Sequence, residues 1–315
     1  MPTEFAPVTV AVPGTCGELV QGWHAAWDQA VLVSCPITCT NQLTVQLQEE
    51  PVISVLGSPP AASVKLRQAA RLALDAFDAG QRPDLGAHIR VSRQLPLGRG
   101  MASSTADVVA VLAAVALALG LSPPPAKKLA RLACCIEPSD STMFAELTLL
   151  AYRDEGRHET LGRAPALPLL LLDTGRAVDT LAYNAHLDLA ASRRLAASTE
   201  MALTMLKMGL STQDAVTIGA AASLSAQSYQ AVNPSPLVAQ AQRWVMATGA
   251  VGLVRAHSGS LVGLLYPPET ELAEPAAWLA SRFRGQLNQT QLTGGGYLLV
   301  EHQIEPSPTN PEYIR

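Results

Sequence analysis

The feature that most constrains this chain is a glycine-containing loop that runs directly into a long apolar segment. The loop reads Leu95-Pro96-Leu97-Gly98-Arg99-Gly100-Met101-Ala102-Ser103-Ser104-Thr105-Ala106. Small residues let backbone N–H groups gather around an anion, and the N-terminus of a following helix adds partial positive charge. The loop therefore predicts a phosphate-binding site, although it has neither the Gly-Lys-Ser/Thr ending of a Walker loop nor the pattern G-x-G-x-x-G.

Length and charge exclude several classes of protein. The chain has 315 residues, of which 48% are apolar and 15% charged. These values predict a folded protein of about two domains. The net charge of −4 and the absence of a polybasic cluster argue against a nucleic-acid partner and against an anionic membrane surface.

The cysteines and the N-terminus point to the cytoplasm. The five cysteines have no C-x-x-C spacing, which argues against a disulfide framework and a zinc site. Cys134 and Cys135 lie in an apolar helical run, so we expect buried free thiols. No signal peptide is recognisable, and the longest apolar run, Val108 to Leu121, is too short to span a bilayer.

Hydrophobic periodicity predicts a mixed α+β chain. In the first half we expect these elements: strands at 8–12, 30–39, 42–48 and 87–92, a hairpin or loop at 13–22, and helices at 63–79, 104–119 and from 126 to about 136. In the second half we expect strands at 169–173, 251–255, 261–266 and 297–300, and helices at 186–208, 211–231 and 236–248. Gly, Pro and Arg between 162 and 168 predict a boundary between domains 1–164 and 165–315.

Three segments in a fixed order carry a family resemblance. They are Pro13–Gly22, Pro96–Ala106 and Ala256-His257-Ser258-Gly259-Ser260. Together they resemble the motifs of the GHMP kinases, which include galactokinase, homoserine kinase and mevalonate kinase. The resemblance implies a two-domain α+β fold, with an N-terminal domain like ribosomal protein S5 domain 2 and a ferredoxin-like C-terminal domain. It also implies ATP and Mg²⁺ as cofactors and a small-molecule substrate, and it allows a homodimer.

Other segments resemble one branch of this family, the L-threonine kinases. They are Cys16–Gly22, Val33–Pro36, Gly100–Asp107, Glu137–Thr142 and Ala256–Ser260. The resemblance implies ATP-dependent phosphorylation of the threonine hydroxyl to O-phospho-L-threonine, which supplies the aminopropanol linker of cobalamin. Two alternatives are a kinase for homoserine or another small amino alcohol, and a catalytically silent ATP-binding regulatory protein.

The resemblance assigns the nucleotide to the glycine loop. The expected contacts are Pro96, Gly98, Arg99, Gly100, Met101, Ala102, Ser103, Ser104 and Thr105. The Ser104 hydroxyl can reach the metal or the β-phosphate. In the alternative interpretation the two serines only cap the helix, since Ser104-x-x-Asp107 resembles a capping box.

Two carboxylates carry the expected chemistry, with Ser104. Glu137 lies where the family's metal-binding glutamate is expected, and the alternative is an ordinary surface residue at a helix end. Asp140 would accept the proton of the substrate hydroxyl, or else it caps a helix beginning at Ser141. Only two residues separate Glu137 from Asp140. This short spacing leaves three alternatives: both residues act, Asp140 alone acts, or Glu137 is structural.

The other two motifs supply the expected substrate side. Its residues are Cys16, Gly17, Glu18, His257, Ser258, Gly259 and Ser260. Glu18 would bind the ammonium of an amino acid, or it is a surface charge at a strand edge; His257 is equally explained as a hydrogen-bonded structural group.

Two further features remain open. Relatives carry a lysine beside the first motif, where this chain has Thr15 and Cys16, so Arg99 is a candidate for the missing charge. A second glycine loop, Thr293–Gly296, is expected to be only a turn.

Overall fold

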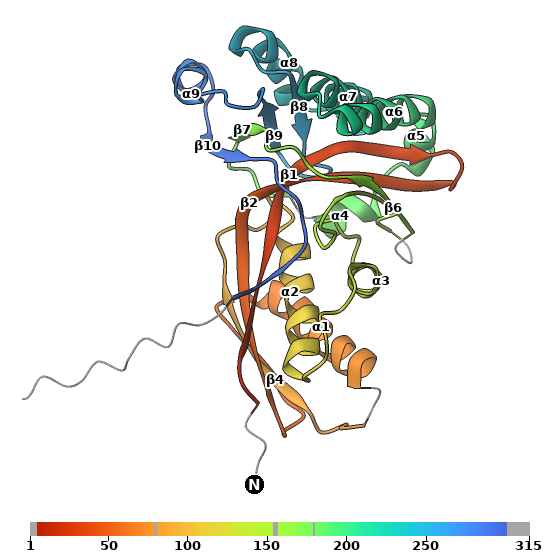
Figure 1. Ribbon diagram of the computed structural model, residues 1–315, viewed down its shortest axis with the longest axis vertical. Coiled ribbons are helices and arrows are strands. Elements are labelled where there is room, and N and C mark those ends of the chain that lie inside the picture. The colour runs from red at the N-terminus through yellow and green to blue at the C-terminus, as the bar shows by residue number, and fades with distance from the viewer. Residues whose placement is uncertain (1–4, 79–80, 154–156, 179, 301–315) are drawn as a thin grey trace, which may run out of the picture.

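The computed structural model describes residues 5–78, 81–153, 157–178 and 180–300 (Figure 1). The elements of the first half are β1 (Val8–His24), β2 (Gln29–Gln48), β3 (Ile53–Leu56), α1 (Pro60–Asp78), β4 (Gly86–Ser92), α2 (Ser103–Ala118), α3 (Ala126–Cys134), β5 (Leu147–Leu150) and β6 (His158–Gly162). Those of the second half are β7 (Pro168–Asp173), α4 (Thr180–Ala185), α5 (Leu189–Arg193), α6 (Ala196–Thr212), α7 (Ala215–Ser228), the 3₁₀ turn η1 (Tyr229–Ala231), α8 (Pro236–Thr248), β8 (Gly252–Arg255), β9 (Leu261–Leu265), α9 (Ala273–Ala280), β10 (Gln286–Gln291) and β11 (Leu298–Val300).

One sheet runs through the described parts of both halves. Its strand order is β10-β7-β9-β8-β1-β2-β4-β3, with β11 added beside β1 and β5 beside β2. Figure 1 shows β1 and β2 as a long hairpin that lies beneath the upper helices α6 and α7 and then bends down along α2. The two longest strands therefore belong to both parts of the molecule.

The expected loop at Pro13–Gly22 is wrong, because this segment continues β1. The pairing of β1 with β2 shifts register at three places, between Pro13 and Thr15, between Thr15 and Glu18, and between Glu18 and Val20. Each shift is a bulge or irregularity that bends a strand without ending it. The glycines that suggested a turn therefore lie inside a bent strand. In the same way, the two strands expected at 30–39 and 42–48 form the single strand β2.

The apolar helix α2 is buried on all sides, as its sequence predicts. Thirteen of its sixteen residues are buried, and it packs between strands β1 and β2 and the helices α1 and α3. The neighbouring α3 ends at Cys134 instead of Ile136. Cys134 is therefore only half-buried and Cys135 is exposed, which corrects the expectation of two buried thiols.

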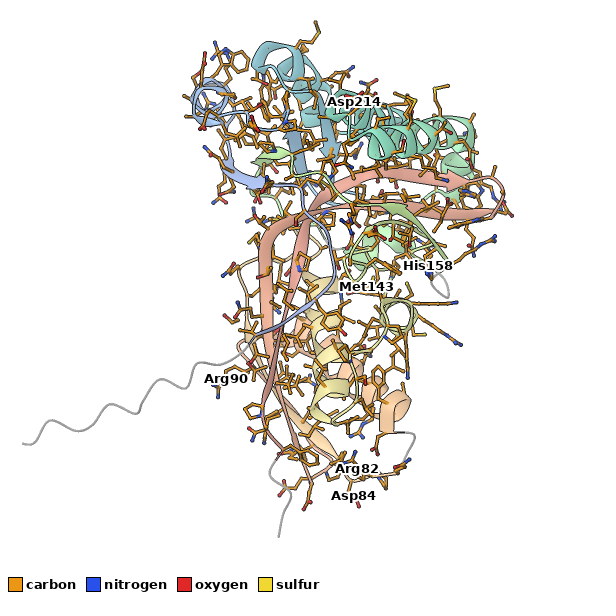
Figure 2. The ribbon with its side chains drawn as sticks, viewed as in Figure 1. Arg82, Asp84, Arg90, Met143, His158 and Asp214 are labelled. Atoms are coloured by element: carbon orange, nitrogen blue, oxygen red, sulfur yellow. The ribbon has the colours of Figure 1, made fainter. Side chains whose placement is uncertain are left out.

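Helix boundaries in the second half follow their caps. The Asp214 carboxylate accepts hydrogen bonds from the backbone N–H groups of Val216 and Thr217, so α7 begins after Asp214 (labelled in Figure 2). Ser211, expected to open this helix, belongs to α6, which ends at the left-handed residue Gln213. The C-terminus of α8 at Gly249 agrees with the sequence.

Two hydrophobic clusters stabilise the molecule. The larger one includes α2, β1, β2 and the inner faces of α6 and α7. The smaller one surrounds Trp244 and Phe283 in the second half. Among the described residues no helix combines the length and the apolar character needed to cross a membrane. The boundary between 164 and 165, which falls between β6 and β7, stays a prediction.

Candidate active site

The three motif segments meet around one open cavity, whose volume together with the solvent space at its mouth is about 660 Å³. Of the residues expected from sequence, its lining includes Glu18, Gly98, Gly100, Met101, Ala102, Ser103, Ser104, Thr105, Glu137, Asp140, His257 and Ser258. Pro96, Arg99, Cys16, Gly17, Gly259 and Ser260 lie outside this lining. Tyr152 lines the cavity and was missed, because an isolated tyrosine at the end of a strand carries no sequence signal.

The glycine loop leaves the start of α2 open to an anion. Gly98 and Gly100 have φ values of 71° and 81°, and Ala102, the N-cap residue, has a φ of 53°. Among the described residues no side chain caps this helix, which corrects the expected capping box. The Ser104 hydroxyl donates to Glu137 Oε1, and Asp107 is bound by Asn41 and Arg93. Within the described part of the chain, the first-turn N–H groups of α2 therefore have no side-chain acceptor and can bind an anion.

Glycines outside the lining let the motifs pack closely. A Cβ on Gly259 would lie 2.7 Å from the carbonyl oxygen of Arg99, and one on Gly17 would lie 2.2 Å from the carbonyl carbon of Arg255. The Thr15 N–H donates to the Met101 carbonyl at 3.1 Å. The first and third motifs thus form the support of the loop, and any larger side chain at either glycine would separate them.

Asn41 ties this loop to α2 and was not found from sequence. Its Nδ2 donates to Asp107 Oδ1 at 2.7 Å, and its Oδ1 accepts from the backbone N–H groups of Gln94 and Leu95. Asn41 is fully buried in β2. No signal in the sequence pointed to it, because residue 41 falls between the two strands expected at 30–39 and 42–48.

Glu137 is buried, so the interpretation as a surface residue is wrong. It is 5% exposed; Oε1 accepts from Ser104, and Oε2 binds the Lys65 ammonium at 2.5 Å. Lys65 also donates to the Ser104 hydroxyl at 3.1 Å. Sequence analysis missed Lys65 because α1 and the loop come together only in the folded chain.

The oxygen atoms of Glu137 and Ser104 fit the ligand preferences of a magnesium ion. Mg²⁺ prefers hard oxygen ligands and usually takes only one or two protein carboxylates. Glu137 and Ser104 supply one carboxylate and one hydroxyl, and a cation already lies against both oxygens in the form of the Lys65 ammonium. The described residues contain no group of three or more His, Cys, Asp or Glu arranged for a metal.

Asp140 lies at the cavity wall and caps no helix. Its Oδ2 accepts a hydrogen bond from Thr105 Oγ1 at 3.0 Å, and its backbone N–H donates to the same hydroxyl. Burial raises the pKa of its carboxyl above the usual value. No helix follows it, because residues 141–146 form turns and bends.

The loop after Asp140 is braced by the second glycine segment. Gly296 N–H donates to the Thr142 carbonyl at 2.7 Å, and a Cβ on Gly295 would lie 2.4 Å from the Phe144 carbonyl oxygen. Met143, labelled in Figure 2, marks this loop beside α2, between the upper and lower parts of the molecule. Thr293–Gly296 therefore has a packing role and is more than a turn.

Glu18 is a buried carboxyl, not a charge at an exposed strand edge. It is 2% exposed, and its Oε2 is buried without a hydrogen-bond partner among the described residues. Burial, followed by the nearby Asp140, raises the pKa of Glu18 well above its usual value. Two carboxyls thus share one wall of the cavity, which favours a positively charged ligand.

His257 is a neutral ring held at both nitrogens. Its Nδ1 lies 2.8 Å from Gln21 Oε1, which can only accept, so Nδ1 carries the proton and Nε2 accepts from the Tyr152 hydroxyl at 3.0 Å. Burial, then the charges of Arg255 and Arg153, lowers the pKa of His257 to about 3. His257 therefore adds no charge to the cavity at neutral pH.

Arg99 faces away from the expected nucleotide position. Its Nη1 binds both carboxylate oxygens of Asp173, at 3.0 and 3.2 Å. In this arrangement Arg99 joins the loop to the end of β7. The positive charge beside Ser104 comes from Lys65 instead.

Comparison with known proteins agrees with this geometry. Residues 65–145 match the family model of the GHMP kinases N terminal domain. The chain is 31% identical to the L-threonine kinase of Salmonella typhimurium over 288 residues, covering 89% of this chain and 88% of that protein.

Solved structures show the same fold at low identity. The homoserine kinase of Cytophaga hutchinsonii superposes with a TM-score of 0.69 and 15% identity, covering 93% of this chain and 97% of that one. The mevalonate diphosphate decarboxylase of Enterococcus faecalis, described with its ATP binding mechanism, gives a TM-score of 0.70 at 19% identity, with 94% and 99% covered. The match to the GHMP kinases N terminal domain and the likeness to an L-threonine kinase over nearly the whole chain place the protein among the GHMP kinases, as a small-molecule kinase.

Proposed function

We propose that this kinase transfers the terminal phosphoryl group of ATP to the side-chain hydroxyl of L-threonine, giving O-phospho-L-threonine and ADP. The observation that carries the proposal is the convergence of the uncapped α2 N-terminus, the Glu137–Ser104 pair and Asp140 on one cavity. Phosphoryl transfer needs phosphates held in place, charge stabilisation and a positioned hydroxyl. The L-threonine kinase relative supports threonine as the acceptor.

Each group has a role in this proposal. The backbone of residues 98–104 and the N-terminus of α2 bind the phosphates. Glu137 and Ser104 would hold Mg²⁺, and the bound ion would spread the negative charge of the phosphates. Asp140 accepts the hydroxyl proton while the threonine oxygen bonds to phosphorus and the bond to ADP breaks.

Glu18 supports an amino acid as the acceptor. Its Oε2, which has no hydrogen-bond partner among the residues that the structure describes, lies in a wall that already contains Asp140, and the neutral His257 adds no competing positive charge. An ammonium group is the part of threonine that this wall would recognise. The product would then supply the aminopropanol linker of cobalamin, as the threonine kinase resemblance implies.

A panel of acceptors tests the proposal. Purified protein is incubated with MgATP and, separately, L-threonine, L-serine, L-homoserine and 2,3-dihydroxybutyrate, in which a hydroxyl replaces the amino group. Mass spectrometry should find phosphothreonine as the preferred product and almost none from dihydroxybutyrate. Preference for homoserine would favour the alternative kinase, and nucleotide binding without any product would favour a regulatory protein.

The Asp140→Asn variant tests the proposed base. Losing a general base costs about 10²- to 10⁴-fold in rate, so kcat should fall by about that factor while the affinity for ATP stays within a few fold. Asp214→Asn is the matched control, because it removes a carboxylate at the start of α7 (Figure 2). An unchanged kcat for Asp140→Asn would remove this residue from the mechanism.

A further inference from the structure

The Lys65 ammonium occupies the place between the two oxygen ligands proposed for magnesium. Its Nζ lies 3.1 Å from Ser104 Oγ and 2.5 Å from Glu137 Oε2. The Glu137 side chain is only 3% exposed, whereas that of Lys65 is 22% exposed. Lys65 therefore neutralises a buried carboxylate, while its own side chain remains partly exposed to solvent.

Two arginines near the loop already form ion pairs with other carboxylates. Arg99 binds Asp173 and Arg93 binds Asp107, and neither of these aspartates lines the cavity. Lys65 differs because the carboxylate with which it pairs, Glu137, is the one proposed to bind the metal. A second cation on Glu137 would repel the ammonium at short range.

We propose that Lys65 exchanges partners during the catalytic cycle: it pairs with Glu137 in the nucleotide-free protein and binds a terminal phosphate oxygen of ATP in the loaded one. This inference rests on the nucleotide site of the proposed function. A lysine suits the exchange because its ammonium is a compact charge on a flexible four-carbon stem. Phosphate oxygens are strong acceptors for such a donor.

The exchange predicts two opposite effects of removing the lysine charge. Without Lys65, Glu137 is a buried carboxylate with no cationic partner, so it should bind a divalent cation by itself more readily. The same change removes a phosphate contact, so the affinity for nucleotide should fall. A residue that only stabilised the fold would not move the two affinities in opposite directions.

The test measures both affinities directly, without turnover. Mn²⁺, which also accepts carboxylate and water ligands, is titrated by electron paramagnetic resonance in the absence of nucleotide, and AMPPCP binding is measured by calorimetry with EDTA present. For Lys65→Met we expect Mn²⁺ to bind at least tenfold more tightly and AMPPCP at least tenfold more weakly than in the wild type. Lys65→Gln should behave the same way, and Lys65→Arg should keep the weak Mn²⁺ binding.

Lys128→Met is the matched control. Lys128 donates to the Ala76 carbonyl and lies over the Phe77 ring, outside the cavity lining, so both affinities should stay within twofold. Shifts of both affinities in the same direction, or no shift in either, for Lys65→Met and Lys65→Gln would overturn the exchange. Failure to phosphorylate threonine would instead overturn the proposed acceptor and leave these binding results unaffected.

Discussion

At the scale of single residues, His257 shows how a fold can fix the chemical state of a side chain. Gln21 and Tyr152 hold its two ring nitrogens. The rings of Tyr152, Tyr183 and Tyr229 lie with their centroids 5.0 to 5.4 Å from the imidazole. Protonation of His257 would add a positive charge among these buried rings, close to Arg255. The folded state therefore favours the neutral form of the ring.

This state predicts a pH dependence of stability. The pKa of His257 is about 3 in the folded chain and about 6.5 in the unfolded one. Between these pH values the unfolded chain binds a proton at His257 and the folded chain does not. The stability that the neutral His257 ring contributes is therefore complete above pH 6.5 and is lost as the pH falls toward 3. Between pH 6.5 and 5.0 this loss is about 1.5 kcal/mol.

Urea unfolding at pH 6.5 and 5.0 measures this loss against His257→Asn, which cannot titrate. The free energy of unfolding should fall more steeply for the wild type, by about 1.5 kcal/mol. Equal losses in the two proteins would show that His257 is not held neutral.

The contiguous motifs predicted which segments line the cavity, although not every residue of those motifs does so. The loop around Gly100, the acids Glu137 and Asp140, and Glu18 all lie at the cavity. Lys65, Asn41 and Tyr152 could not be predicted, because their partners are 39, 66 and 105 residues away along the chain. Their importance depends on tertiary contacts that no local pattern encodes.

At the scale of elements, strong local patterns predicted structure well and mixed patterns did not. The apolar α2 and the buried β7, β8 and β9 were predicted. The strand β10 was missed because its sequence, Gln-Leu-Asn-Gln-Thr-Gln, is polar and mostly exposed, and its pairing with β7 alone makes it a strand. The bends of β1 were mistaken for a loop because a bulge and a turn both use glycine.

The glycine segment behind the Asp140 loop gives a prediction at this scale. A Cβ on Gly295 would lie 2.4 Å from the Phe144 carbonyl oxygen and 2.5 Å from that of Thr142. Gly295→Ala should therefore displace the loop, destabilise the protein by about 1–3 kcal/mol and lower kcat at least tenfold. Stability is measured by urea unfolding and kcat by steady-state kinetics.

Gly86→Ala is the control for crowding alone. Its Cβ would meet the backbone oxygens of Glu50 and Val52 at 2.1 and 2.2 Å, at the paired ends of β2 and β4. Gly86→Ala should lower the free energy of unfolding by a similar amount. Under conditions where both variants are folded, it should leave kcat unchanged. Equal kcat losses in the two variants would show that the glycine segment has no particular effect on the Asp140 loop.

At the scale of the whole molecule, the continuous sheet predicts a single unfolding transition. Strand β1 pairs with β2, β8 and β11, so it is bonded to strands from both halves. Variants that keep only Trp23, in the larger cluster, or only Trp244, in the smaller one, should give the same urea midpoint. Two separate midpoints would show instead that the halves divided near residues 164–165 unfold independently.

The brace at Thr293–Gly296 also bears on how the enzyme is made. Ribosomes synthesise a chain from its N-terminus, so the glycine loop and Asp140 emerge from the exit tunnel before the glycines that hold the loop after Asp140 in place. A nascent chain would carry every acid of the site yet lack the last support. Translation itself would thus delay phosphoryl transfer until the ribosome has passed Gly296.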